Sequence, residues 1–214
     1  MKKRDYGQLC SLAKALDVVG ERWTLLIIRD LLGGPKRYKD LITGLPGMGA
    51  NLLASRLKAM EGEGLIEKTR LPPPSRVSAY QLSQRGQALE NVVVALARWG
   101  IPLLERAKSD DLWSAGWNHL AMKARFNAEA AQEISGVYAF QIDKYAYFIR
   151  IEKGEMAFEQ GQTEAADVRL ICSESDFKKV FVLGEMSLEA ALEQGIFSIE
   201  GDPLELKTCL ALFR

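Results

Sequence analysis

Residues 46–66 read Pro-Gly-Met-Gly-Ala-Asn-Leu-Leu-Ala-Ser-Arg-Leu-Lys-Ala-Met-Glu-Gly-Glu-Gly-Leu-Ile, which predicts a helix that leads directly into a strand. Apolar residues recur at steps of three and four, so one stripe of the helix faces a core. This stripe is Met48, Leu52 or Leu53, Leu57 and Met60. The opposite face holds small, hydrogen-bonding and basic side chains, namely Asn51, Ala54, Ser55 and Lys58. Such a face suits the edge of a DNA groove, although an ordinary amphipathic surface helix shows the same pattern.

The segments on either side of this helix favour the DNA-binding interpretation. Upstream, residues 23–32 are apolar around most of a helix, which predicts a buried central helix, and residues 38–42 predict a second, short one. Downstream, residues 65–70 and 77–82 predict two strands joined by the proline-rich loop 71–76. Three helices with a tight turn before the third, followed by a hairpin with a wing, indicate a winged helix-turn-helix domain.

Four stretches of this region resemble the HxlR family of bacterial winged-helix regulators. They are Cys10-Ser-Leu-Ala-Lys-Ala-Leu-Asp-Val-Val-Gly-Glu-Arg-Trp-Thr-Leu-Leu-Ile-Ile-Arg-Asp-Leu-Leu, Arg37-Tyr-Lys-Asp-Leu, Leu57-Lys-Ala-Met-Glu and Tyr80-Gln-Leu-Ser-Gln-Arg-Gly. The resemblance implies a homodimer on pseudopalindromic double-stranded DNA, with the helix from Ala50 to Lys58 in the major groove. Two departures leave the operator sequence open. Gly49 stands where the family usually has a capping Ser or Thr, and Asn51 stands at an often basic position.

These elements give a hypothesis for the DNA contacts. Asn51 and Ser55 are expected to read base edges, and Arg56 and Lys58 are expected near the DNA backbone. Three cations at 36–39 are expected to hold phosphates, and Arg76 on the wing is expected in the minor groove or on its phosphates. The complete predicted interface is Lys36, Arg37, Tyr38, Lys39, Ala50, Asn51, Ala54, Ser55, Arg56, Lys58, Ser75 and Arg76.

Net charge divides the chain into two unlike halves. Residues 1–110 hold 18 Lys and Arg against 11 Asp and Glu, a net charge of +7, whereas residues 111–214 hold 10 against 17, a net charge of −7. Because phosphates attract the first half and repel the second, the DNA-facing surface is expected in the first half. Solvated surface without a partner is the alternative interpretation of the basic half.

A further helix, predicted from about Gln84 to Trp99 with Ser83 as its cap, carries an apolar stripe that needs a partner. We expect it to pair with its twin in a homodimer and with the first helix, Leu9 to Val19. Packing within one chain is the alternative. Residues 105–112 are charged and follow the helix-interrupting Gly100-Ile-Pro102, so they are expected to form a linker.

The second half has a different period. At 214 residues the chain can hold two domains, and we expect boundaries at 1–104 and 113–214. Residues 136–142, 145–151 and 155–159 predict a meander of antiparallel strands. A fourth strand at 167–173, helices at 176–182 and 187–193, a last strand at 196–200 and a terminal helix at 204–213 follow. The fold class is therefore α+β, a winged helix-turn-helix domain followed by a domain with an antiparallel-rich curved sheet.

This half is similar to the sterol carrier protein type two-like domains, over roughly residues 113–214. The similarity rests on Asp167-Val-Arg-Leu-Ile-Cys-Ser-Glu-Ser-Asp-Phe177, Gly184, Ala190, Gly195 and Phe197-Ser-Ile-Glu-Gly-Asp202. It implies a sheet covered by helices and an apolar tunnel for a lipid-like or other hydrophobic small molecule. The aromatic side chains expected to line it are Phe140, Phe148, Phe158, Phe177, Phe181 and Phe197.

Two interpretations of these aromatic residues stay open, because a filled core and a tunnel have the same composition. The leading functional hypothesis is a transcriptional regulator controlled by a hydrophobic effector in the second domain. The competing hypothesis is a carrier of hydrophobic ligands whose winged helix makes protein contacts only. Binding to DNA around its own gene distinguishes the two.

The remaining chemistry-bearing residues indicate no enzyme. His119 is the single histidine, and the sequence contains neither a nucleophile elbow nor a phosphate-binding or dinucleotide glycine motif. We therefore expect no catalytic residue, metal or cofactor. The absence of an apolar run long enough to span a bilayer, and of a signal region, predicts a cytoplasmic protein without membrane insertion.

The three cysteines are Cys10, Cys172 and Cys209, an odd number at wide spacing that argues against a disulfide framework. Some HxlR-like proteins sense oxidants or electrophiles through a cysteine near the start of the first helix, which is where Cys10 stands. Cys10 is therefore a candidate redox sensor, and an inert cysteine is the alternative because the sequence supplies no obvious activating base.

Overall fold

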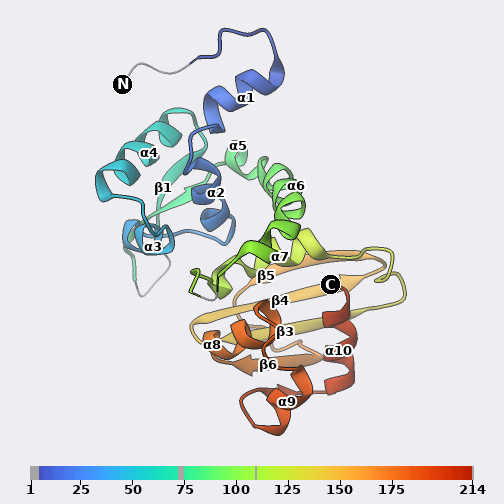
Figure 1. The fold of residues 1–214 in the computed structure, drawn as a ribbon. Helices are drawn as coiled ribbons and strands as arrows, with labels where there is room; N and C mark the ends of the chain where they lie inside the picture. The colour runs from blue at the N-terminus through green and yellow to red at the C-terminus, as the bar shows by residue number, and fades with distance from the viewer. Residues whose placement is uncertain (1–4, 72–74, 109, 214) are drawn as a thin grey trace. The chain divides into compact units, whose positions relative to one another are not determined.

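The computed structural model of the protein describes residues 5–71, 75–108 and 110–213 (Figure 1). The chain forms two compact units, Met1–Ala95 and Leu96–Arg214, and the division between them falls within helix α6 (Glu90–Gly100). The predicted linker at 105–112 begins after this division. Residues 101–106 form a short 3₁₀ helix.

The N-terminal unit has the predicted order of elements. It contains α1 (Ser11–Val19), α2 (Thr24–Leu32), α3 (Tyr38–Gly44), α4 (Ala50–Gly62), β1 (Ile66–Arg70), β2 (Ser78–Leu82), the short α5 (Gln84–Gln87) and the start of α6. The two strands are antiparallel, with Ile66 opposite Leu82. This arrangement confirms a winged helix-turn-helix fold, although the loop residues 72–74 lie outside the described part of the chain.

The core of this unit forms where α2, α3 and α4 meet. Ile27 and Ile28 of α2 are fully buried, as are Leu41 of α3 and Leu53 of α4. The sequence left Leu52 and Leu53 as alternatives for the buried stripe. The structure selects Leu53, because Leu52 is 42% exposed. Burial of Leu53, together with Leu57 and Met60 on the same stripe, fixes the rotation of α4 about its own axis and the face that α4 turns to solvent.

The helix predicted over 84–99 is divided into α5 and α6, and its first part lies against the backbone at Leu65. Ser83 caps α5 as expected, since its Oγ accepts a hydrogen bond from Gly86 N at 3.1 Å and donates one to Gly64 O at 2.6 Å. A Cβ at position 86 would collide with the carbonyl oxygen of Leu65, so glycine is required there. The chain re-enters a helix only at Glu90.

The C-terminal unit places helices on a mixed five-stranded sheet. Its elements are the 3₁₀ turn Ala115–Trp117, α7 (Asn118–Arg125), β3 (Gly136–Ile142), β4 (Tyr145–Glu152), β5 (Glu155–Gln160), β6 (Val168–Cys172), α8 (Glu174–Phe177), a π-helical turn (Lys178–Val182), α9 (Leu188–Glu193), β7 (Ser198–Glu200) and α10 (Pro203–Ala211). The strand order is β5-β4-β3-β6-β7. The antiparallel meander β3-β4-β5 is confirmed, but β6 pairs parallel to β3, which the sequence did not predict.

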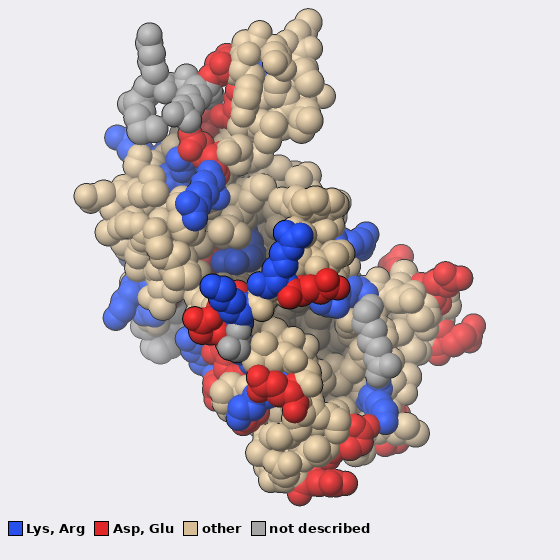
Figure 2. Space-filling view, in the orientation of Figure 1, with Lys and Arg blue, Asp and Glu red and all other residues tan. Residues whose placement is uncertain are grey.

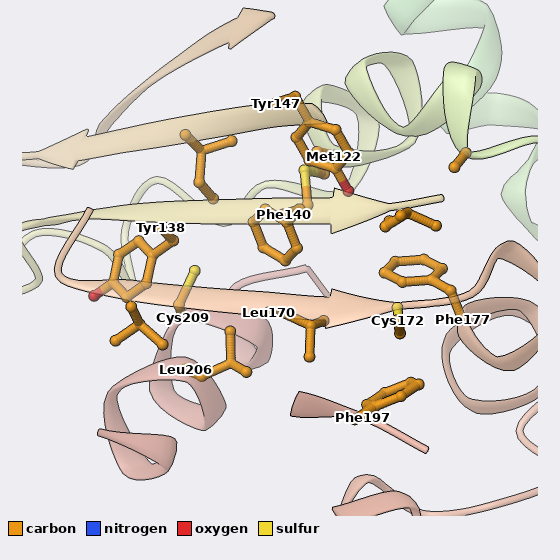
Figure 3. Packing of buried hydrophobic residues seen from close by; sticks show 14 of the residues in the cluster. Met122, Tyr138, Phe140, Tyr147, Leu170, Cys172, Phe177, Phe197, Leu206 and Cys209 are labelled. Carbon is orange, nitrogen blue, oxygen red and sulfur yellow. The ribbon is translucent and has the colours of Figure 1, made fainter. Parts of the chain in front are cut away.

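The two faces of this sheet bury different side chains. One face packs against helices, and its core contains Phe140, Leu170, and Leu206 and Cys209 of α10 (Figure 3). The other face holds a smaller cluster of Val137, Ala139 and Phe148, against which Ala166 of the β5–β6 connection packs. The helix-covered face therefore contains the larger apolar interior, where an apolar molecule would find the most contacts.

Candidate nucleic-acid interface

Helix α4 presents one polar, small-residue face to solvent. Its buried stripe is Leu53, Leu57 and Met60, each at most 2% exposed. The exposed residues that share the opposite face are Ala50, Asn51, Ala54, Ser55 and Lys58. Gly49 precedes the helix in an extended conformation and supplies no side-chain cap. An amide, a hydroxyl and an ammonium group on a face without bulky side chains can approach base edges and phosphates.

The start of α4 is tied to α3 by one hydrogen bond. Tyr38 Oη donates to the carbonyl oxygen of Ala50 at 2.6 Å. Tyr38 is the first residue of α3 and is half-buried, whereas Lys39 beside it is exposed. The bond therefore fixes the predicted phosphate-binding segment next to the N-terminal end of α4.

Arg37 is held by a carboxylate on its own helix. Its Nη2 lies 2.8 Å from Asp40 Oδ1, and its Nε donates to Asp40 Oδ2 at 2.9 Å. The same carboxylate accepts a hydrogen bond from the backbone N–H of Arg37 at 3.1 Å, which satisfies a donor that the start of α3 leaves without a partner inside the helix. The Arg37 guanidinium lowers the pKa of Asp40, and the carboxylate raises the pKa of Arg37. A phosphate at this position would have to share or replace Asp40.

The backbone of Lys36 adjoins the wing hairpin. Lys36 N donates to Tyr80 O at 3.0 Å, and Tyr80 N donates to Lys36 O at 2.8 Å. At the wing itself, Ser75 and Arg76 are exposed, and Arg76 has a φ of 44°. Lys68 on β1 pairs with Glu61 of α4 at 3.0 Å, which raises the pKa of this lysine.

Arg56 differs from the other predicted contacts. Its side chain is only 14% exposed, and its Nη2 lies 3.0 Å from Glu21 Oε2. Its Nε is buried without a hydrogen-bond partner. The structure thus turns Arg56 inward, toward the loop before α2. Sequence reasoning did not identify Glu21, because an ion pair between residues 35 positions apart leaves no periodic signal.

Five of the six predicted ligand-binding phenylalanines belong to one cluster. Phe140 and Phe158 stack on either side of Tyr147, with ring centroids 5.0 and 4.8 Å away. Phe177, Phe181 and Phe197 form a second series of ring contacts at 4.6 and 5.7 Å. Phe148 does not join them, because it lies in the small cluster on the opposite face of the sheet. Neighbouring residues of a strand point to opposite faces, and Tyr147 occupies the helix-covered one.

A buried polar group accompanies these rings. Asn118 Nδ2 donates to Tyr147 Oη at 2.8 Å, and both side chains are almost fully buried. Burial raises the pKa of Tyr147 far above its usual range. His119 is also buried. Its Nδ1 lies 3.2 Å from Gly116 O, and its ring meets the Phe158 ring edge-on at 6.0 Å. These groups give the apolar interior a polar edge supplied by α7.

The HxlR-like helix-turn-helix family matches residues 18–108. The uncharacterized HTH-type transcriptional regulator sll1512 of Synechocystis sp. is 32% identical over 101 residues, which are 47% of this chain and 74% of that protein. The HTH-type transcriptional regulator YodB of Bacillus subtilis is 35% identical over 85 residues, 40% of this chain and 76% of YodB. This chain belongs to the HxlR-like helix-turn-helix family. It is accordingly a helix-turn-helix transcriptional regulator.

Solved structures each match about half of this HxlR-like chain. The reduced form of YodB is 31% identical and matches with a TM-score of 0.39, over 47% of this chain and all of the YodB chain. The SCP-2 sterol transfer family matches residues 118–210. The sec-alkylsulfatase Pisa1 from Pseudomonas sp. matches with a TM-score of 0.42 and 17% identity. The match covers 47% of this chain and 16% of the Pisa1 chain. Because the SCP-2 match begins after the HxlR-like match ends, the regulator domain is followed by an SCP-2 domain.

Several large apolar side chains of the HxlR-like chain are exposed on helices or beside them. Next to and within α1 they are Leu9, Leu12 and Leu16, of which Leu9 is completely exposed. Along α6 they are Val92, Leu96 and Trp99, and Trp99 is 71% exposed. Only Ala13 of α1 is buried. Exposed apolar helix faces of this size are a feature of protein–protein contact surfaces.

The three thiols of the HxlR-like chain have different environments. Cys10 is exposed and directly precedes α1, whereas Cys172 and Cys209 are buried in the C-terminal core. Burial raises the pKa of Cys172 to about 12 and also raises that of Cys209. Reaction with oxidants at neutral pH is therefore expected at Cys10 before the two core cysteines.

The two units of the HxlR-like chain differ in the charged side chains on their surfaces. Basic side chains are visible on the N-terminal unit, and acidic ones stand along the lower and right-hand edges of the C-terminal unit in Figure 2.

Residues 5–71, 75–108 and 110–213 contain no group of three His, Cys, Asp or Glu able to hold a metal ion. Within these same ranges no helix has the length and apolarity needed to cross a bilayer.

Proposed function

We propose that this regulator binds pseudopalindromic double-stranded DNA as a homodimer and inserts α4 into the major groove. The observation that carries the proposal is the exposed face of α4, which is polar and free of bulky groups beside a cation-rich segment tied to its first turn. Asn51 and Ser55 contact base edges, and Lys58 contacts the backbone. The alanines at 50 and 54 permit the close approach.

The phosphate contacts come from two segments beside α4. Lys36, Arg37 and Lys39 bind phosphates at the start of α3, where Tyr38 fixes their position relative to α4. Ser75 and Arg76 on the wing bind the minor groove or its phosphates. Arg56 is not among the proposed DNA contacts, because its guanidinium faces Glu21.

The exposed apolar residues of α1 and α6 support the dimer. A two-fold contact between copies would bury apolar side chains that are exposed in one chain, namely Val92, Leu96 and Trp99 of α6 and Leu12 of α1. A two-fold dimer presents two α4 helices to half-sites about one helical turn, roughly 34 Å, apart. Sedimentation of the full chain tests this step, with a dimer expected and Trp99→Ser expected to weaken it.

The SCP-2 domain is proposed to bind an apolar effector and to have no catalytic role. This proposal is supported by the aromatic cluster around Tyr147 and by the polar edge that Asn118 and His119 supply. The protein is proposed to act in the cytoplasm. Thermal denaturation with and without palmitate or cholesterol tests effector binding. A ligand at one hundred times its Kd stabilises the domain by about 2.7 kcal/mol, and no shift with either compound would contradict an effector site.

The DNA proposal is tested by the salt dependence of binding. Fluorescence anisotropy is measured with DNA from around the protein's own gene and with random-sequence duplexes, between 50 and 200 mM salt. The triple variant K36A/R37A/K39A removes six cations from a dimer, so the slope of log K against log salt should fall by about 5, at about 0.9 for each phosphate contact. K144A, on the loop between β3 and β4, is the matched control and should leave the slope unchanged. An unchanged slope in the triple variant would contradict the phosphate contacts.

A further inference from the structure

The ion pair between Arg56 and Glu21 joins two elements that DNA recognition requires. Arg56 lies in the middle of α4, and Glu21 lies in the turn between α1 and α2. The backbone carbonyl of Glu21 accepts a hydrogen bond from Thr24 N at 2.9 Å, so Glu21 is fixed to the first residue of the central helix. Thr24 itself is 1% exposed. The pair therefore connects the recognition helix to the rigid start of α2.

The position of Arg56 on α4 excludes it from the face that reads DNA. At about 100° per residue, the centre of the face formed by Asn51, Ala54, Ser55 and Lys58 lies about 150° from Arg56. The centre of the buried stripe of Leu53, Leu57 and Met60 lies only about 65° from it. This placement agrees with an Arg56 side chain that is 14% exposed.

The environment of the guanidinium indicates a fixed rather than a mobile group. Arg56 Nη2 lies 3.0 Å from Glu21 Oε2, and the buried Nε has no hydrogen-bond partner among the described residues. A partly buried guanidinium depends strongly on its carboxylate, because removal of one partner leaves a charge without compensation. Glu21 is 40% exposed, so water reaches the carboxylate side of the pair.

We propose that Glu21 and Arg56 are positioning residues that set the orientation of α4 against α2, and thereby the specificity of the protein for its operator. This inference rests on the proposed DNA-binding function. The pair adds no phosphate contact. It holds Asn51 and Ser55 at the angle at which they meet base edges, while the cations at 36–39 supply affinity for any duplex.

The test measures affinity and salt dependence with two probes. One is the strongest-binding fragment from around the gene, and the other is a random-sequence duplex of the same length. E21Q and R56Q should each weaken binding to the gene fragment about tenfold, with binding to the random duplex and both salt slopes unchanged. The charge-reversed pair E21R/R56E should recover most of the lost specificity. R56K, which keeps the charge without the planar fork, should fall between wild type and R56Q.

Three results would overturn the proposal. A salt slope lowered by about 2 in R56Q would make Arg56 a phosphate contact in each subunit. Tighter binding with a steeper slope in E21Q would mean that Glu21 withholds Arg56 from DNA. Equal weakening on both probes would indicate a general loss of structure.

A measurement without DNA separates this inference from the proposed function. Hydrogen exchange of the α4 amides should be faster in E21Q and in R56Q, and the double variant E21Q/R56Q should be no worse than either single variant. If wild type discriminates no DNA fragment, the proposed function fails while the exchange data still test the contact. Additive exchange effects in the double variant would show that the two residues act independently, against the proposal.

Discussion

Replacement of Tyr147 by phenylalanine tests the buried polar pair of the SCP-2 domain. Tyr147 is 3% exposed and Asn118 5% exposed, and the bond between Asn118 Nδ2 and Tyr147 Oη is 2.8 Å long. Y147F keeps the ring between Phe140 and Phe158 but leaves the Asn118 amide without this partner. A buried donor that loses its partner costs about 1–3 kcal/mol. For a unit of this size, 1 kcal/mol corresponds to a fall in melting temperature of about 4–8 °C.

The assay is calorimetric melting of the full chain together with hydrogen exchange of the β4 amides. Y147F should melt at least about 4 °C lower and exchange faster in β4. The double variant N118L/Y147F replaces both partners by apolar groups of similar size, so it should be more stable than Y147F alone. Y145F is the matched control. Tyr145 is only half-buried and its hydroxyl bonds to Ser114, so a smaller loss is expected. A Y147F protein as stable as wild type, or a double variant less stable than Y147F, would refute the reasoning.

Three further predictions concern the N-terminal unit and the thiols. Iodoacetamide at pH 8 should label Cys10 in the folded protein, and it should label Cys172 and Cys209 only after unfolding. Mass spectrometry of digests measures the labelling. Labelling of a core cysteine in the folded protein would be inconsistent with its burial. S83A removes the cap of α5 and its bond to Gly64 and should lower the free energy of unfolding by about 1–2 kcal/mol in urea titrations, whereas S75A at the exposed wing should have little effect. Because the pKa of Asp40 is lowered in the folded state, its ion pair stabilises the protein above the ordinary carboxylate pKa, and this contribution is lost as pH falls through the lowered value. D40N should therefore make the free energy of unfolding less dependent on pH below the ordinary carboxylate pKa, by less than about 1 kcal/mol, which is the screened value for an exposed pair. A full wild-type pH dependence in D40N would contradict the assignment.

The sequence predicted the elements of the N-terminal unit because their signals are local. The repeat of Leu53, Leu57 and Met60 defines a buried stripe, and Ser83 caps a helix within three residues of itself. Both signals depend on spacings that a helix imposes on neighbouring positions. The sequence did not predict the break after α5, nor the packing of Gly86 against the carbonyl of Leu65, which lies more than twenty positions away.

Contacts between distant positions were the part of the candidate site that could not be predicted. Arg56 reads as a cation on a DNA-binding helix, and only the fold shows that Glu21 lies beside it. In the sequence, Phe148 and Phe140 both have the pattern of buried aromatic residues on predicted strands. Adjacent strand positions face opposite sides, and the sequence does not say whether residue 147 or 148 meets the helices, since both are large and apolar.

The parallel pairing of β3 with β6 has a consequence for how this protein is made. One edge of β3 pairs with β4, which follows it directly in the hairpin. The other edge pairs with β6, which comes only after β4, β5 and the connection at 161–167. On the ribosome, the winged-helix segment can fold while the backbone groups along this edge of β3 are still unpaired, and pairing with β6 is a long-range step. A chain that ends between β5 and β6 would have an unpaired edge on β3, which is a template for aggregation.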